Sequence, residues 1–155
     1  MTVREFEEKD TKAVCDLVNE AFNEFVAPSF TKAGIKRWLE KHVPKEQVKR
    51  SKERDVYVAV LGDKIVGMIE GRHQEDGQGR ISRLFVSKHY HKRGIAKSLV
   101  NRIEVLYKGK GIKSMVASSS LYAQIFYNKM GYKKTRGVVK SEKNGMVYQP
   151  MKKIF

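Results

Sequence analysis

Three β-strand patterns follow one another between residues 55 and 86 without a helical pattern between them. The first two, VYVAVL and KIVGMIEG, are apolar and rich in β-branched residues, and the turn residues Gly62 and Asp63 separate them. A second turn, DGQG at residues 76–79, leads into the third strand at residues 80–86. Because strands joined by such short turns pair antiparallel, this stretch predicts three antiparallel strands at the centre of a sheet.

Two helices are predicted before these strands. Apolar residues recur at helical spacing over residues 11–25, where we expect Asp10 to be the N-cap. A second helix begins after Thr31, a residue type that caps helices well, and Pro44 is expected to close it. The charged stretch at residues 45–54 fits either a surface helix or a loose connection.

Helices and strands alternate after residue 86. A helix is predicted over residues 94–107, a strand over 112–117 and a last helix over 121–130, after which Gly131 fits a left-handed C-terminal position. Two more strands are expected on either side of the turn signal Asn144-Gly145, over residues 132–139 and 146–151.

With a short strand at residues 2–6, the predicted order of elements is β-α-α-β-β-β-α-β-α-β-β. This order, with several strands joined by short turns, is typical of an α+β protein. No internal repeat or linker divides the chain, so residues 1–155 are expected to form a single domain.

The chain is strongly basic, with 32 Lys and Arg residues against 17 Asp and Glu residues and a formal net charge of +15. Such an excess attracts anions. Nucleic acid, a phosphorylated cofactor and an acidic substrate are therefore all candidate partners at this point.

Cysteine usage and hydropathy indicate a cytoplasmic protein. Cys15 is the single cysteine and lies in an apolar helical pattern, so we expect a buried hydrophobe and no internal disulfide. No apolar run reaches the ~18 residues that a membrane span needs. The first ten residues also lack the apolar run of a signal peptide. We therefore expect no membrane segment.

The six residues HKRGIA, at positions 91–96, join the third central strand to the helix after it. The N-terminus of a helix presents unpaired backbone N–H groups and a partial positive charge, which together bind anions. Gly94 and Ala96 leave the backbone accessible to a phosphate. Three cationic side chains surround the turn: Lys92, Arg93 and Lys97. The segment therefore predicts a phosphate-binding turn.

This segment resembles motif A of the GCN5-related N-acetyltransferase (GNAT) superfamily, in which Gln or Arg precedes two residues, Gly, any residue, and Gly or Ala. The matching positions are His91, Lys92, Arg93, Gly94, Ile95 and Ala96, after the apolar residues Leu84, Phe85 and Val86. Downstream, SSSLYAQIFYNKMGY resembles motif B of the family, through Ser120, Ala123, Phe126, Tyr127, Gly131 and Tyr132. His91 and Ser120 depart from the family pattern, which leaves the role of the His91 side chain open.

The resemblance implies the GNAT fold, a three-layer α/β/α arrangement with helices on both faces of one mixed, mostly antiparallel sheet. It also implies acetyl-CoA as cosubstrate and no metal. A main-chain N–H near Phe85 is implied to meet the thioester carbonyl. The strand at residues 84–86 is implied to splay from the strand at 112–117, so that the pantetheine arm of the cofactor enters between them. The residues implied to bind the cofactor are Leu84, Phe85, Val86, His91, Lys92, Arg93, Gly94, Ile95, Ala96, Lys97, Ser120, Ala123 and Phe126.

The resemblance also implies N-acetylation of an amine by direct transfer within a ternary complex. Tyr127 matches the family tyrosine that points at the cofactor sulfur and is the candidate general acid. Some relatives place a carboxylate where this chain has Arg80, so Glu70, inside the apolar strand KIVGMIEG, becomes the candidate general base. Three alternatives remain: Glu70 faces solvent or pairs with Arg72 or Arg83, His73 is the base, or a chain of water molecules serves without a dedicated base.

The acceptor is expected to be a primary amine of a small molecule or peptide. Phe25, Phe30 and Trp38 lie where GNAT proteins build the acceptor site, and they either line it or pack in the core. The net charge of +15 disfavours a polyamine, and the sequence is compatible with a monomer or a homodimer. The alternative function is a non-catalytic acyl-CoA-binding module that docks on RNA or a ribosome. The chain has no aromatic-rich RNA-binding signature, so nucleic acid is not the expected partner.

Overall fold

The structure, a computed structural model, describes residues 1–142 and 145–155. One sheet runs through the molecule in the strand order β1-β2-β3-β4-β5-β8-β6, and β7 pairs with β8. The strands are β1 (Thr2–Glu5), β2 (Asp55–Leu61), β3 (Lys64–His73), β4 (Gln78–Val86), β5 (Ser114–Ser119), β6 (Lys133–Lys134), β7 (Val139–Lys140) and β8 (Val147–Ile154). The helices are α1 (Thr11–Ala21), α2 (Lys32–Lys41), α3 (Pro44–Glu53), α4 (Ile95–Gly109) and α5 (Gln124–Lys129). Neighbouring strands pair antiparallel, except that β4 and β5 pair parallel.

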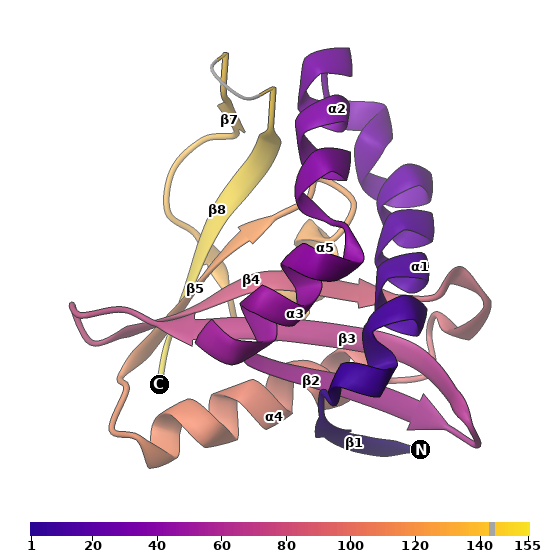
Figure 1. The fold of residues 1–155 in the computed structure, drawn as a ribbon. Helices are drawn as coiled ribbons and strands as arrows, with labels where there is room; N and C mark the ends of the chain where they lie inside the picture. Colours follow the sequence, from indigo (N-terminus) through magenta and orange to yellow (C-terminus); the bar gives the residue numbers. More distant parts are fainter. Residues whose placement is uncertain (143–144) are drawn as a thin grey trace.

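Helices cover both faces of the sheet, so the predicted three-layer arrangement is confirmed (Figure 1). On one face α4 packs against β2, β3 and β4, with Leu99 and Ile103 fully buried in the larger core cluster. On the other face α1 packs against β3 and β4, with Val14 and Val18 buried in a second cluster. Cys15 is buried as predicted. Each face of the sheet therefore has its own apolar core.

A β-bulge in β4 changes which faces its side chains occupy. The register shifts between Glu70 and Gly71 of β3, which pair with Arg83 and Ile81, so Ser82 has no partner on β3. An extra residue in one strand turns the following side chains to the opposite face. The bulge thus sets which residues after Ser82 face α1 and which face α4.

The strands β4 and β5 are paired at one end and separate towards the end of β4, as the resemblance implied. They pair only between residues 78–81 of β4 and residues 114–117 of β5. The remainder of β4, residues 82–86, has no β5 partner among the described residues. On this free stretch Leu84 packs against the cluster under α4 and Phe85 against the cluster under α1. The result is a fork in the sheet with a different apolar surface on each side.

Asp10 stands at the N-cap position of α1, as predicted, but its side chain makes no capping hydrogen bond to this helix. The 3-10 turn Glu8–Asp10 runs directly into α1 with helical backbone at Asp10, so the carboxylate points back along the chain. There it accepts hydrogen bonds from the Glu7 backbone N–H at 2.9 Å and from the Arg4 guanidinium at 2.7 and 3.0 Å.

The sequence predicts that Pro44 closes the second helix, but in the structure Pro44 begins the next one. The second helix, α2, ends at Lys41, and Pro44 begins α3, because proline lacks an N–H and suits the first turn of a helix. The charged stretch whose structure the sequence left open is therefore helical. Thr31 caps α2 as predicted, its hydroxyl accepting from the Gly34 N–H at 3.0 Å.

The C-terminal strands differ from the prediction in length. The first predicted strand is reduced to the two-residue strands β6 and β7, whereas β8 extends to Ile154. Gly131 adopts the predicted left-handed conformation, with φ of +91°. Asn144, half of the predicted turn, lies outside the described residues.

Trp38 of α2 is sandwiched between two rings. Its ring centroid lies 3.7 Å from that of Phe22 and 3.6 Å from that of His42, and both pairs are nearly parallel. His42 is buried, and its Nδ1–H donates to the Trp38 backbone carbonyl at 2.5 Å. Burial lowers the pKa of His42 to about 3. The hydrogen bond to Trp38 acts in the opposite direction and raises the pKa, whereas the charges of Arg83 and Arg50 contribute to lowering it. His42 is thus neutral in the folded protein.

We expect the folded protein to lose stability as the pH falls below 6.5. His42 of the unfolded chain takes up a proton near pH 6.5, whereas folded His42 does so only near pH 3, so lower pH favours unfolding. The free energy of unfolding should fall by about 2 kcal/mol between about pH 6.5 and pH 5. Urea unfolding, followed by the fluorescence of Trp38, measures this change. The variant His42→Phe keeps a stacked ring without the proton, and an equal loss in that variant would contradict the assignment.

Candidate functional site

A cavity of about 910 Å³ opens where β4 and β5 separate. Its walls come from the end of α1 and the turns after it, α2, β4 with the start of α4, α5 with the loop before it, and the start of β8. The predicted site residues in its lining are Leu84, Phe85, Val86, His91, Lys92, Gly94, Ile95, Ala96, Lys97, Ser120, Ala123, Phe126 and Tyr127. Arg93 and Glu70, the other two predicted site residues, are not part of the lining. The fork in the sheet therefore brings the two motifs to one cavity.

The turn at residues 91–96 has the backbone geometry of an anion site. Lys92 and Gly94 both have left-handed backbone, with φ of +62° and +76°. This conformation is uncommon for a lysine, and such strain is concentrated at functional sites. Gly94 is the N-cap of α4, and as a glycine it has no side chain that could cap the first N–H groups of this helix. A Cβ built at Gly94 would meet no atom within 4 Å, so the space above the turn is open.

His91 holds this turn against the end of β4. Its Nε2 lies 2.9 Å from the Val86 carbonyl, which can only accept, so Nε2 carries the hydrogen. Nδ1 then accepts from the Tyr122 hydroxyl at 3.3 Å. Phe25 stacks on both rings, at 4.8 Å from His91 and 4.5 Å from Tyr122. His91 thus joins the turn to the segment after α1 and to the loop before α5.

Tyr127 lies in the cavity wall with 5% of its surface exposed. Its ring makes T-shaped contacts with Phe126 at 5.3 Å and with Tyr132 at 5.4 Å, which fix its orientation. Burial raises the pKa of its phenol, with no contribution from a charge or hydrogen bond of the described residues. The hydroxyl is therefore protonated at neutral pH and has its proton available for a ligand.

Two serines at the fork use their hydroxyls differently. Ser120 Oγ accepts from the Ala123 N–H at 3.2 Å and so stabilises the turn before α5. Ser82 Oγ, at the bulge, is buried in the cavity lining without a partner among the described residues. An unpaired buried hydroxyl costs free energy, which a bound ligand can recover. Sequence reasoning missed Ser82, because a bulge depends on the register of two strands together.

Glu70 is fully buried behind the cavity wall. Its carboxylate contacts three arginines: Arg83 at 2.5 Å, Arg50 at 3.1 Å, and Arg54. Burial alone would raise the pKa of this carboxyl, but the charges of Arg83, Arg50 and Arg54 together hold the pKa below its usual value. One of the alternatives drawn from the sequence, the ion pair with Arg83, is therefore present. The assignment of Glu70 as general base stays a prediction.

Arg93 lies outside the cavity, with its guanidinium 5.2 Å from the centroid of the Tyr90 ring. The contact of Arg93 with the cofactor stays a prediction.

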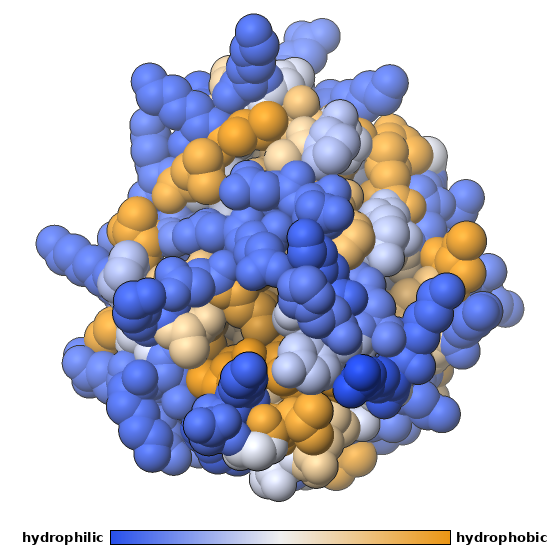
Figure 2. All heavy atoms as spheres, turned by 90° about the vertical axis from the view of Figure 1, so that its right-hand side faces the viewer, coloured by the Kyte–Doolittle hydropathy of each residue, from blue (hydrophilic) through white to orange (hydrophobic). Residues whose placement is uncertain are grey.

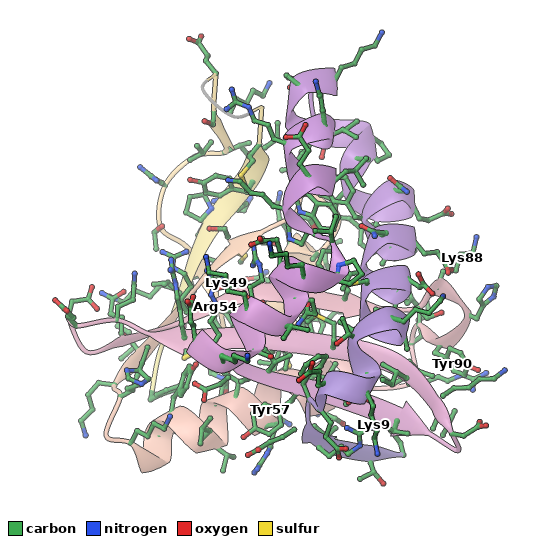
Figure 3. All side chains as sticks on the ribbon, viewed as in Figure 1. Lys9, Lys49, Arg54, Tyr57, Lys88 and Tyr90 are labelled. Carbon is green, nitrogen blue, oxygen red and sulfur yellow. The ribbon has the colours of Figure 1, made fainter. Side chains whose placement is uncertain are left out.

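Tyr90 (Figure 3) lines the cavity at the fork and also a second cavity of about 900 Å³, to which His89 and Lys9 contribute. Figure 2 shows the face that carries α1 and the Lys88–Tyr90 turn. Polar side chains cover most of this face, with apolar patches between them.

Phe25, Phe30 and Trp38, the residues expected in the acceptor region, all line the cavity. Trp38 also packs against the core cluster under α1, so it combines core packing with a place in the cavity wall. The charged side chains in the lining are all basic: Arg83, Lys92, Lys97 and Lys129. Among the described residues that form the cavity, none is an Asp or Glu. The cavity is therefore apolar with a positive potential.

In the part of the chain that the structure describes, no helix is long and apolar enough to span a membrane. No group of three or more His, Cys, Asp or Glu residues there is placed to hold a metal ion.

By sequence, most of this chain matches a family model: residues 26–155 match the acetyltransferase (GNAT) domain. No curated protein matches the chain by sequence.

Several solved structures resemble the fold closely. The PaiA N-acetyltransferase of Thermoplasma acidophilum in complex with coenzyme A is 20% identical, with a TM-score of 0.82 over 99% of this chain and 98% of that chain. A GCN5-related N-acetyltransferase from Rhodopseudomonas palustris is 17% identical, with a TM-score of 0.83 over 99% and 95% of the two chains. An aminoglycoside 6'-N-acetyltransferase complexed with coenzyme A is 19% identical, with a TM-score of 0.71 over 99% and 97%. At these identities the likeness shows a shared fold.

Proposed function

Because this chain belongs to the GNAT acetyltransferase family, we propose that it moves the acetyl group of acetyl-CoA to a primary amine by direct transfer in a ternary complex. The observation that carries this proposal is the cavity at the fork of β4 and β5, where the phosphate-binding turn, the free edge of β4 and Tyr127 meet. Two similar solved structures contain coenzyme A, which supports the same choice of cosubstrate here.

In this proposal the pyrophosphate, the pantetheine arm and the thioester of acetyl-CoA each contact a different element of the cavity wall. The pyrophosphate binds the free N–H groups at the start of α4, with Lys92 and Lys97 as counter-charges. The pantetheine arm lies along residues 82–86 of β4, whose backbone groups on that side have no β5 partner. Phe126 and Ala123 of the opposite wall pack against the arm. The thioester then lies near Tyr127.

In the transfer, the amine nitrogen attacks the thioester carbon, so that a C–N bond forms and the C–S bond breaks. A main-chain N–H near Phe85 donates to the carbonyl oxygen while negative charge develops on it. The departing sulfur takes the proton of the Tyr127 hydroxyl, and solvent replaces that proton. The surplus proton of the amine leaves to water, since no carboxylate of the described residues lines the cavity.

The proposal is tested by the release of free thiol from acetyl-CoA in the presence of a panel of primary amines. Thiol should appear with acetyl-CoA and a suitable amine together, and the acetylated amine should appear in equal amount by mass spectrometry. Binding of acetyl-CoA without turnover on a broad panel would contradict catalysis and favour a non-catalytic acyl-CoA-binding module.

We expect the variant Gly94→Ala to raise the KM for acetyl-CoA about tenfold, because left-handed backbone costs a residue with a Cβ about 1 kcal/mol or more. Strain at Gly94 moves the N–H groups that hold the pyrophosphate. The matched control is Gly77→Ala, in the turn between β3 and β4, where φ is +77° and a Cβ likewise meets no atom within 4 Å. Both variants should lose similar stability, but only Gly94→Ala should weaken acetyl-CoA binding. Equal KM values in the two variants would contradict the assignment of the turn.

A further inference from the structure

The cavity has a second half that the cosubstrate does not explain. This acceptor half is lined by Phe25, Phe30, Trp38, Phe85 and Arg83. Trp38 and Phe85 pack with the cluster under α1, on the opposite side of β4 from Leu84 and α4. Most of its surface is aromatic, so it fits a flat or bulky apolar body.

Arg83 is the cationic residue of this half, and the side chains around it do not fully neutralise its positive charge. Arg83, Arg50 and Arg54 share the single carboxylate of Glu70, so the cluster has an excess of two positive charges. Arg83 donates from Nε and Nη2 to Glu70 and from Nη2 to the Gln47 amide oxygen at 2.7 Å. Its Nη1 has no hydrogen-bond partner among the described residues. Arg83 thus presents positive charge and a free donor at the cavity wall.

Resting on the acetyl transfer proposed above, we propose that the acceptor is an aromatic or bulky apolar amine that also carries a carboxylate, of which an aromatic amino acid is the simplest example. The ring packs among Phe30 and Trp38, and the carboxylate accepts a charge-assisted hydrogen bond from the free Nη1 of Arg83. The same positive potential repels a polycation, which would need acidic side chains that the described lining lacks.

This arrangement also helps the chemistry. The attacking amine must be neutral, and a nearby positive charge lowers the pKa of an ammonium group. The excess charge of the arginine cluster therefore increases the fraction of neutral amine. An acceptor site of this kind works without a carboxylate base in its wall.

The first test compares matched amines that differ in the carboxylate alone. Phenylalanine is compared with 2-phenylethylamine, and 4-(aminomethyl)benzoate with benzylamine, with spermidine as the polycation. We expect kcat/KM to be at least about tenfold higher for the carboxylate member of at least one pair, and lowest for spermidine. Equal or faster reaction of the amines without a carboxylate would overturn this proposal while leaving acetyl transfer intact. Absence of acetylation of every amine, including a broad panel, would contradict the transfer itself.

The second test changes the charge behind the wall. Arg50→Gln reduces the excess from two charges to one and leaves Arg83 and Arg54 on Glu70. The control Lys49→Gln removes the same charge from an exposed neighbour on α3 (Figure 3). Arg50→Gln should lower the preference for the carboxylate member several-fold, with the rate on 2-phenylethylamine as a measure of intact protein, whereas Lys49→Gln should leave the preference unchanged. Equal effects of the two variants would overturn the assignment to the cluster.

Discussion

Replacing Tyr127 with phenylalanine should lower kcat about 100-fold, the lower end of what a positioned proton donor contributes. Phenylalanine keeps the ring and its contacts with Phe126 and Tyr132, and removes only the hydroxyl. Because the hydroxyl acts on the sulfur in the transition state, the KM for acetyl-CoA should change little. Steady-state kinetics with a saturating amine separate the two constants.

The control for this variant is Tyr57→Phe. Tyr57 of β2 is as deeply buried as Tyr127, at 3% exposure, but lies outside the cavity lining (Figure 3). It should keep the wild-type kcat. A kcat of Tyr127→Phe within about threefold of wild type would remove the proton donor from the mechanism. A loss of kcat that disappears with an activated thioester of a more acidic thiol would support it, since a good leaving group needs no proton.

Local patterns were sufficient for the elements whose signals lie within one segment. The β2–β3 turn, the helix α4 and the cap at Thr31 depend on residues that are close in sequence, and the structure confirms each of them. Asp10 occupies the predicted N-cap position without capping α1, because its carboxylate has two competing donors nearby and Arg4 on the neighbouring strand offers it a charged one. The short C-terminal strands carried weak patterns, and pairing with β8 alone decides their length.

The structure brings the predicted site residues together where the chain positions them through the backbone. The turn before α4 and the fork of β4 follow from one strand-turn-helix unit, so two sequence motifs were enough to bring their residues to one cavity. Ser82 and the arginine cluster could not be predicted in this way. The bulge needs the register of β3, and Arg50 and Arg54 come from α3, the segment whose structure the sequence left open.

The variant Glu70→Gln should lower the free energy of unfolding by about 3–5 kcal/mol, because it leaves buried guanidinium charges without their counter-charge. Glutamine keeps the shape of the side chain, and Arg83, at 6% side-chain exposure, is too buried for solvent to compensate its charge. The control Asp16→Asn breaks the exposed pair with Lys12, and it should leave the free energy of unfolding nearly unchanged. Urea unfolding at neutral pH measures both variants.

The acid limb of the stability curve distinguishes this structural role from that of a catalytic base. The arginines outweigh burial and hold the folded pKa of Glu70 below its unfolded value of 4.5, so its contribution is present above that pH and is lost as the pH falls through the folded pKa. The gap in stability between wild type and Glu70→Gln should therefore narrow in acid. If Glu70 were instead the general base, the variant would keep its stability, lose kcat by about 100-fold or more and lose the acidic limb of the pH–rate profile. Because three arginines bind the carboxylate and Glu70 is not part of the cavity lining, we expect lost stability with activity retained by the folded fraction.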